Sequence, residues 1–158
     1  MAFNNRTTLI TAGEILTGYI FLDSEILWEA LQASGSNTAH MYPEGNKRLA
    51  MIGDAALKLA ILYALRSRNL PRGSMDSLVQ RIVNNTNLER VGRRIHLEDL
   101  VNRNPSQQGD VPPRTVSDTL EAILGAVYLD SGSDLGAVRL VMANLRLWPE
   151  ESQPSASL

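Results

Sequence analysis

The sequence predicts an all-α protein, a helical bundle packed around one central, strongly apolar helix. Apolar residues recur three and four positions apart along most of the chain, which is the spacing of a helix face. Long runs of alternating apolar and polar residues, which are typical of strands, do not occur in it. With 158 residues, 44% of them hydrophobic, the chain suffices for one domain with a single buried core. We therefore expect one domain over residues 1–148 and a flexible tail over residues 149–158.

Caps and breaks indicate where each helix begins and ends. Thr11 is placed to cap a short helix over residues 13–19, and Asp23 or Ser24 is placed to begin a second helix. After a loop over residues 35–45, the longest periodic stretch, residues 46–68, is apolar on most of its faces and predicts the central helix. After a break at residues 71–74, we expect a helix carrying Leu78, Ile82 and Val83 and then a helix carrying Leu88, Val91 and Ile95. An exposed loop over residues 102–114 should follow. The last two elements expected are a second very apolar helix over residues 116–129 and a helix carrying Val138, Val141, Met142 and Leu145.

The composition excludes several classes of function. The 15 Lys and Arg residues are balanced by 17 Asp and Glu residues, so contact with a nucleic acid requires a local patch rather than a basic arm. The absence of cysteine rules out disulfides, zinc–thiolate sites and cysteine nucleophiles. The amino-terminal residues lack a charged start followed by a continuous apolar stretch, so we expect no secretory signal and no membrane span. The expected location is intracellular, in an unspecified compartment.

Acidic residues stand within the two most apolar helices, where a core helix normally has none. Asp54 lies in AMIGDAAL beside Gly53, whose missing side chain lets another helix or a ligand approach closely. Asp118 and Glu121, in SDTLEAILGA, are three apart and share one helix face. A buried carboxylate has to be protonated, paired or bound to metal. Together the three offer oxygen ligands from two helices, the kind of set that Mg²⁺ or Mn²⁺ prefers beside waters and a substrate phosphate.

Each acidic residue also has a purely structural interpretation. Asp118 followed three residues later by Glu121 matches a capping box, in which the aspartate begins a helix. Asp54 lies two turns into its helix, where the alternative is a buried salt bridge, for instance to Arg48. The sequence leaves these alternatives open, although the occurrence of two such blocks in one chain favours a functional site.

The same two blocks resemble the ribonuclease III family. The family signature is Asn-Glu-Arg-Leu-Glu-Phe-Leu-Gly-Asp, and residues 46–54 are NKRLAMIGD, which retains the first Asn, the Arg, the Leu, the Gly and the final Asp. The second family block, an Asp, a Glu three residues later and an apolar run ending Tyr-Leu-Asp-Ser-Gly, matches Asp118, Glu121 and residues 128–132. With a weaker upstream match, LTGYIFLDSEILWEAL, the resemblance extends over residues 15–145.

This resemblance implies a ribonuclease III-type endonuclease domain that cuts double-stranded RNA. Matched residue by residue, Asp54, Asp118 and Glu121 are the implied catalytic and metal-binding carboxylates, with Mg²⁺ or Mn²⁺ as cofactor. Metal-bound water would attack a backbone phosphodiester, while the metal stabilises charge on the attacking and leaving oxygens. The family dimerises through its signature helix. Met51 stands where a family Phe fills a pocket of the partner subunit, so the resemblance implies a homodimer with Met51 at its interface.

Two positions of the signature depart from the family at its working face. Lys47 replaces the first signature Glu, and Ala50 replaces the metal-binding Glu. Residues 47, 50 and 54 are three and four apart, so they share one helix face. An inward ammonium group offsets carboxylate charge, so the affinity for metal is expected to fall, and Lys47 could even stand in for the cation. A further acidic residue of the family is also missing, and Glu44, just before the signature, is a candidate substitute.

The sequence therefore leaves two functions open. The first is a ribonuclease III-like enzyme whose cleavage of double-stranded RNA is weakened by Lys47 and Ala50. The second is a noncatalytic subunit of the same fold that binds RNA or serves assembly. For either function, Arg90, Arg93 and Arg94 in LERVGRRIHL are candidate contacts to RNA phosphates, with a solvated face as the structural alternative.

Overall fold

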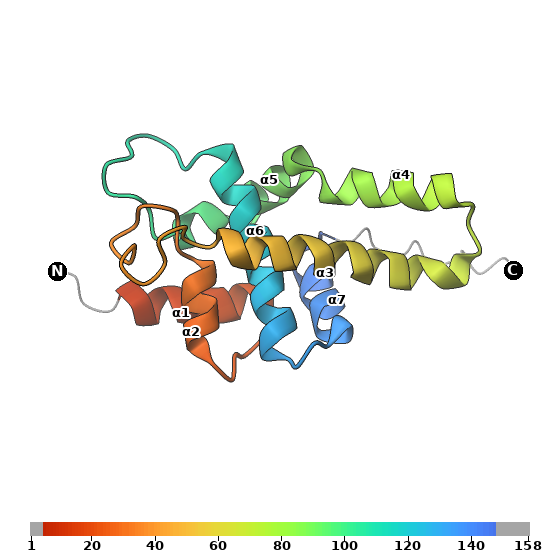
Figure 1. Cartoon of the computed structure of the whole chain (residues 1–158), viewed down its shortest axis with the longest axis horizontal. Helices are drawn as coiled ribbons and strands as arrows, with labels where there is room; N and C mark the ends of the chain where they lie inside the picture. The colour runs from red at the N-terminus through yellow and green to blue at the C-terminus, as the bar shows by residue number, and fades with distance from the viewer. Residues whose placement is uncertain (1–4, 148–158) are drawn as a thin grey trace, which may run out of the picture.

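The computed structural model describes residues 5–147, and these form seven α-helices and two short 3-10 helices (Figure 1). They are α1 (Asn5–Thr17), α2 (Ser24–Ala30), α3 (Lys47–Leu65), η1 (Arg66–Arg68), α4 (Arg72–Val83), α5 (Asn85–Arg94), η2 (Leu97–Leu100), α6 (Pro113–Asp130) and α7 (Leu135–Asn144). Residues 5–147 contain no β-strand, only one isolated bridge between Gln32 and Asn102. The all-α class is thus confirmed, whereas the expected tail, residues 149–158, lies outside the described residues.

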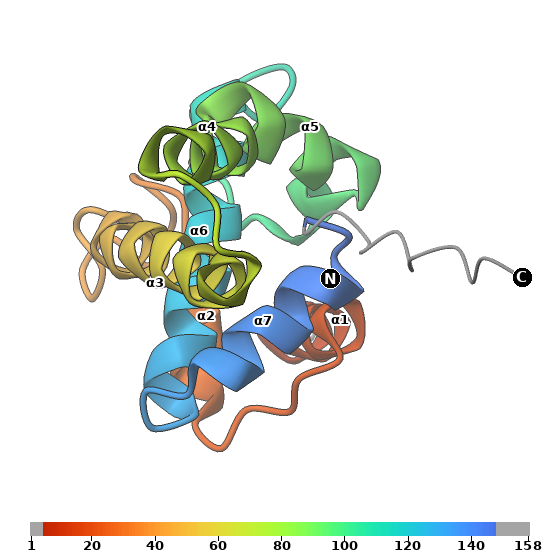
Figure 2. The same ribbon diagram turned by 90° about the vertical axis from the view of Figure 1, so that its right-hand side faces the viewer.

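Helices α3 and α6 cross at the centre of the molecule, and two glycines allow their backbones to touch (Figures 1 and 2). A Cβ atom on Gly53 would lie 1.6 Å from the backbone oxygen of Glu121. A Cβ atom on Gly125 would lie 2.3 Å from the backbone oxygen of Leu49. Neither position therefore accepts a side chain without a backbone shift. The expected central helix is confirmed as α3, but α6 shares the centre and is buried continuously from residue 116 to residue 127.

The other helices surround this crossing and bury its apolar side chains. Helix α4 runs back along α3, and α5 and α7 both pack against α6 (Figures 1 and 2). Leu57 and Ile61 of α3 and Leu120, Ile123 and Leu124 of α6 are fully buried between these layers. Burial on several faces explains why the α3 and α6 sequences are apolar around most of their circumference. Within residues 5–147, no helix combines the length and apolar character that crossing a membrane requires.

The first helix is longer than the sequence predicts. Helix α1 begins at Asn5, so Thr11 lies inside the helix and the prediction that Thr11 caps it is wrong. Leu9 and Ile10 pack against the core, and these tertiary contacts extend the helix upstream of the expected cap. At the next helix the prediction is confirmed, because the Asp23 side chain accepts a hydrogen bond from the Glu25 N–H at 3.0 Å and caps α2.

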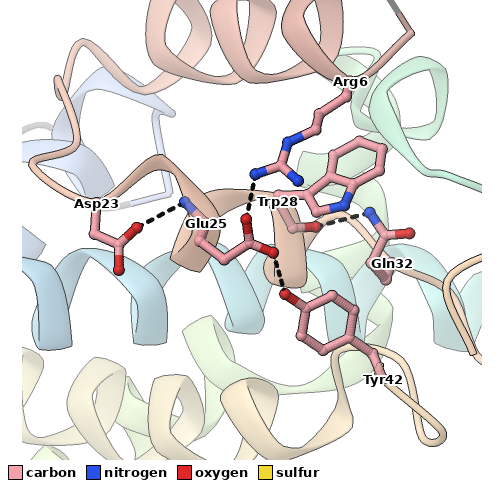
Figure 3. A network of polar contacts seen from close by, with 6 residues as sticks. All are labelled: Arg6, Asp23, Glu25, Trp28, Gln32 and Tyr42. Atoms are coloured by element: carbon pink, nitrogen blue, oxygen red, sulfur yellow. Dashed lines mark hydrogen bonds and ion pairs between the residues drawn. The ribbon is translucent and has the colours of Figure 1, made fainter. Parts of the chain in front are cut away.

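The segment between α2 and α3, residues 31–46, is anchored along its length (Figure 3). The Glu25 carboxylate accepts hydrogen bonds from the Tyr42 hydroxyl and from the Arg6 guanidinium, which also lies 5.5 Å from the centre of the Trp28 ring. The hydrogen bond from Tyr42 lowers the pKa of Glu25. Buried Gln32 donates to the Trp28 backbone oxygen at 2.8 Å. These contacts hold the segment that leads into α3.

Two contacts join the start of α3 to its surroundings. Asn46, buried before the first turn of α3, donates to the Ala30 backbone oxygen at 2.8 Å and to the Thr119 hydroxyl of α6 at 2.9 Å. Asn102 donates from its side chain to Gln32 at 2.7 Å, which ties the loop before α6 to the segment before α3. Both loops consequently lie at the amino-terminal end of α3 (Figure 1).

Candidate active site

Three acidic residues from two helices line one cavity beside the α3–α6 crossing. The cavity has a volume of about 510 Å³ and is lined by Asp54 of α3 together with Asp118 and Glu121 of α6. Asp54 directly follows Gly53, and Gly53 packs on the Glu121 backbone, so the close helix contact brings these acids from distant parts of the chain to the same cavity. The other lining residues are Glu44, Lys47, Ala50, Met51 and Arg114. We call this the carboxylate cavity.

Glu121 is the most perturbed of the three acids. Its side chain is buried, with 8% of the residue exposed, and burial together with the nearby charges of Asp54 and Asp118 raises its pKa to about 7. Arg114 and Lys58 act in the opposite direction and lower the pKa. Three carboxylates around one cavity therefore create a negative potential that favours either a proton on Glu121 or a bound cation.

The other two acids each have a basic partner one helical turn away. Lys58 Nζ lies 3.0 Å from a carboxylate oxygen of Asp54, and Arg114 Nε lies 2.8 Å from one of Asp118. The proposed partner of Asp54, Arg48, is therefore replaced by Lys58. The capping-box interpretation is wrong, because α6 begins at Pro113 and Asp118 is already inside the helix.

The altered signature positions also face this cavity. Lys47 and Ala50 both line it, as their spacing from Asp54 predicts. Ala50 is buried, so only a methyl group faces the cavity at this position. Met51 is 76% exposed at the edge of the cavity and is accessible to another molecule. Glu44, in the segment before α3, brings a fourth carboxylate to the lining.

The donor chemistry of the cavity fits a hard divalent cation such as Mg²⁺ or Mn²⁺. Asp54, Asp118 and Glu121 face the same space as Glu44, and the charges of Asp54 and Asp118 contribute to the raised pKa of Glu121. However, among residues 5–147, no three acidic or histidine side chains are already arranged as a set of metal ligands. Lys58 and Arg114 each engage one carboxylate oxygen of Asp54 and Asp118, and the positive charge of these partners competes with that of a bound cation.

The predicted arginine contacts lie apart from the carboxylate cavity. Arg90, Arg93 and Arg94 belong to α5, and none of them lines it. Arg93 donates to the backbone oxygen of Val111, and Arg94 donates to the backbone oxygen of Leu145 at 3.1 Å. The guanidinium groups of Arg93 and Arg94 therefore connect α5 to neighbouring segments of the fold.

Sequence reasoning missed the two basic residues that pair with the acids. Lys58 lies four residues after Asp54, and Arg114 lies four residues before Asp118. Oppositely charged residues at this spacing meet on one helix face. The signal for both ion pairs was therefore present in the sequence.

Comparison with known proteins identifies the fold and the family. A family model described as ribonuclease-III-like matches residues 23–146. A Ribonuclease 3 from Vibrio vulnificus is 34% identical over 132 residues, covering 80% of this chain and 56% of the relative. A Ribonuclease 3 from Myxococcus xanthus is 41% identical over 101 residues, covering 61% of this chain and 38% of the relative. The chain belongs to the ribonuclease III family, and it spans between about a third and three fifths of the length of these two relatives.

Solved structures show the same architecture. The nuclease domain of ribonuclease III from Campylobacter jejuni superposes with a TM-score of 0.72 at 26% identity, over 85% of this chain and 97% of that one. Giardia Dicer superposes with a TM-score of 0.65 over 92% of this chain and 20% of its own, at 22% identity, which is a likeness of fold. The predicted ribonuclease III-type endonuclease fold is therefore confirmed.

Proposed function

We propose that this chain acts on double-stranded RNA as a homodimeric ribonuclease III-type domain whose phosphodiester cleavage is weak. The observation that carries the proposal is the convergence of Asp54, Asp118 and Glu121 on one cavity at the α3–α6 crossing. All three occupy positions that match the acidic blocks of the family to which the chain belongs. The domain is proposed to comprise residues 1–148, followed by a tail over residues 149–158, in an intracellular protein.

The three acids would hold Mg²⁺ or Mn²⁺ in the carboxylate cavity. When bound, such a cation supplies an activated water and stabilises charge on the attacking and leaving oxygens of a phosphodiester. The helix contact holds Gly53, the residue before Asp54, against the backbone of Glu121, so both acids line the same cavity before any ligand arrives. Because Glu121 is buried, its carboxylate has the most to gain from a neighbouring cation.

Cleavage is proposed to be weak because the carboxylate cavity is less negative than the family signature would make it. Ala50 supplies no carboxylate, and Lys47 brings an ammonium group to the same lining. Lys58 and Arg114 already offset the charges of Asp54 and Asp118, so these acids attract a metal less strongly than unpaired carboxylates would. Activity at raised metal concentration follows from this weakened affinity, since occupancy of the site depends on the concentration of the cation.

An apolar strip on α3 supports the proposed homodimer. Met51, Leu59 and Tyr63 are 76%, 50% and 62% exposed, which is unusual for large apolar side chains on a helix at the centre of a fold. The related Campylobacter jejuni nuclease domain was described for flexibility in a region involved in dimer formation. Burial of Met51 against a second subunit would remove its apolar surface from water.

A noncatalytic RNA-binding or assembly subunit is the second candidate. The observation that favours it is that Asp54 and Asp118 each have a basic partner without any metal. In that case the carboxylate cavity would be a stable, charge-compensated remnant of a metal site. RNA would then be bound without being cut.

Incubation of long duplex RNA with the purified chain across Mg²⁺ and Mn²⁺ concentrations separates the two candidates. We expect slow cleavage that rises with metal concentration, is abolished by Glu121→Gln and, at saturating RNA, is accelerated by Lys47→Glu combined with Ala50→Glu. The matched control is Gln108→Glu, which adds an acid outside the carboxylate cavity. Binding without any cleavage by the native chain at all metal concentrations, with cutting only after both acids are restored, would establish the noncatalytic function instead.

A further inference from the structure

A second cavity adjoins the carboxylate cavity and differs from it in charge. It has a volume of about 270 Å³ and lies between the starts of α3 and α6 and the loop that precedes α6. Lys47, Arg114 and Asp118 line both cavities, so the two share one wall. The remaining lining residues are Ala33, Ser34, Asn46, Asn104, Gln107 and Thr115. We call this the amide cavity.

The amide cavity is lined by hydrogen-bond donors and carries a net positive charge. Its two cations, Lys47 and Arg114, face a single carboxylate, Asp118, and Arg114 already neutralises that carboxylate through its Nε atom at 2.8 Å. The Arg114 side chain is 71% exposed, and the only hydrogen bond it makes within residues 5–147 is this one through Nε, which leaves its terminal nitrogens available to a ligand. Asn104 and Gln107 add primary amides from the loop.

Two helices begin at this cavity, which adds to its preference for an anion. Thr115 and Arg114 belong to the first turn of α6, whose amino-terminal N–H groups receive no side-chain cap. Lys47 is the first residue of α3, and the Asn46 side chain does not cap that helix either. Uncapped N–H groups and helix dipoles favour negative charge at helix starts. The two cations and the cavity itself point to an anion independently of these helix ends.

We propose that the amide cavity binds a backbone phosphate of RNA, next to the phosphodiester presented to the carboxylate cavity. The inference rests on the proposed function, because it takes RNA to be the ligand. The guanidinium of Arg114 suits a phosphate, since its planar donors match two phosphate oxygens. In this proposal Lys47, which stands in place of a signature Glu, contributes to phosphate binding at the wall that the two cavities share.

Charge-matched variants of the loop before α6 test this inference in EDTA, where cleavage cannot interfere. Affinity for a labelled RNA duplex of about 20 base pairs is measured by fluorescence anisotropy. Gln107→Glu places a negative charge in the amide cavity, and we expect it to weaken binding by about fivefold or more. Gln108→Glu adds the same charge at the next residue, which does not line the amide cavity, and we expect the affinity for the duplex to change by less than about twofold. Equal losses in these two variants would overturn the inference.

The basic residues give a second measurement on the same duplex. Arg114→Gln and Lys47→Gln each remove one phosphate contact, so each should lower the slope of log affinity against log salt by about one. Unchanged slopes in both variants would contradict the assignment. The wild-type slope, measured alongside, provides the reference.

Inorganic phosphate distinguishes a failure of this inference from a failure of the proposed function. In the metal-free chain, phosphate should shift the side-chain amide NMR signals of Asn104 and Gln107. The amide signal that is absent from the spectrum of Gln107→Glu is assigned to Gln107. If the native chain binds no duplex, the proposed function fails, and this titration alone then decides whether the cavity takes a phosphate. Phosphate-dependent shifts combined with equal duplex affinity of the two glutamate variants would show a free-phosphate site and overturn the assignment to RNA.

Discussion

The crossing of α3 and α6 and the amino-terminal turns of the same two helices use their residues in opposite ways. At the crossing, Gly53 and Gly125 bring backbone against backbone, and the surrounding side chains are fully buried and apolar. In the amino-terminal turns, Lys47, Arg114 and Asp118 open onto two cavities. The contacts that stabilise this domain and the residues of its candidate site therefore lie in adjacent turns of the same helices, since Asp54 immediately follows Gly53.

The largest expected effect comes from filling the crossing. Gly53→Ala puts a Cβ atom at the position that lies 1.6 Å from the Glu121 backbone oxygen, so the helices have to separate. We expect the free energy of unfolding to fall by about 3 kcal/mol or more, as measured by urea denaturation. Separation would also move Asp54 away from Glu121.

Gly73→Ala is the matched control for that substitution. Gly73 lies in the first turn of α4, and a Cβ atom there would have nothing within 4 Å. The same chemical change should leave stability unchanged or raise it by up to about 1 kcal/mol. Similar losses at Gly53 and Gly73 would refute the backbone contact at the crossing.

An intermediate effect is expected from Glu121→Gln. The backbone of Glu121 lies at the helix crossing, and its side chain lines the carboxylate cavity. The raised pKa of about 7, against an ordinary value of 4.5, means that the folded protein holds this proton more tightly than the unfolded chain does. Native stability therefore falls as pH rises between these two values, whereas a glutamine does not titrate. In EDTA, we expect the variant to gain about 1–3 kcal/mol over the native chain near pH 8, and little near pH 4.5.

Thermal or urea unfolding of both proteins at several pH values measures this difference. A constant difference across the pH range would contradict the raised pKa of Glu121. Addition of Mn²⁺ near pH 8 should reverse the order of stability, because a bound cation stabilises the native carboxylate.

The smallest expected effect concerns the ion pair of Asp54. Lys58 and Asp54 are 42% and 38% exposed, so solvent screens their interaction. Lys58→Gln should lower the free energy of unfolding by at most about 0.5 kcal/mol in urea denaturation. A loss above about 1.5 kcal/mol would show that the charged residues beside the carboxylate cavity support the fold nearly as strongly as the crossing does, which would weaken the contrast between fold and site.

Much of the candidate site was predictable because its signals are local. Asp118 and Glu121 share a face through their spacing alone, and Lys47, Ala50 and Asp54 do so for the same reason. The amide cavity was not predictable, since Asn104 and Gln107 reach it from a loop that is placed by long-range hydrogen bonds. The bond from Asn102 to Gln32, 70 residues apart in the chain, is one of them.

By itself, the sequence determined an all-helical chain, because apolar residues three and four positions apart come together only on the surface of a helix, and it determined which acids share a helix face. Only the tertiary structure decided that Asp54 meets Glu121, because that meeting depends on two distant glycines touching across a helix crossing. It also decided where α1 begins and which backbone oxygens accept hydrogen bonds from Arg93 and Arg94. The physical reason is that periodicity is a property of neighbouring residues, whereas a cavity depends on contacts between segments far apart in the chain.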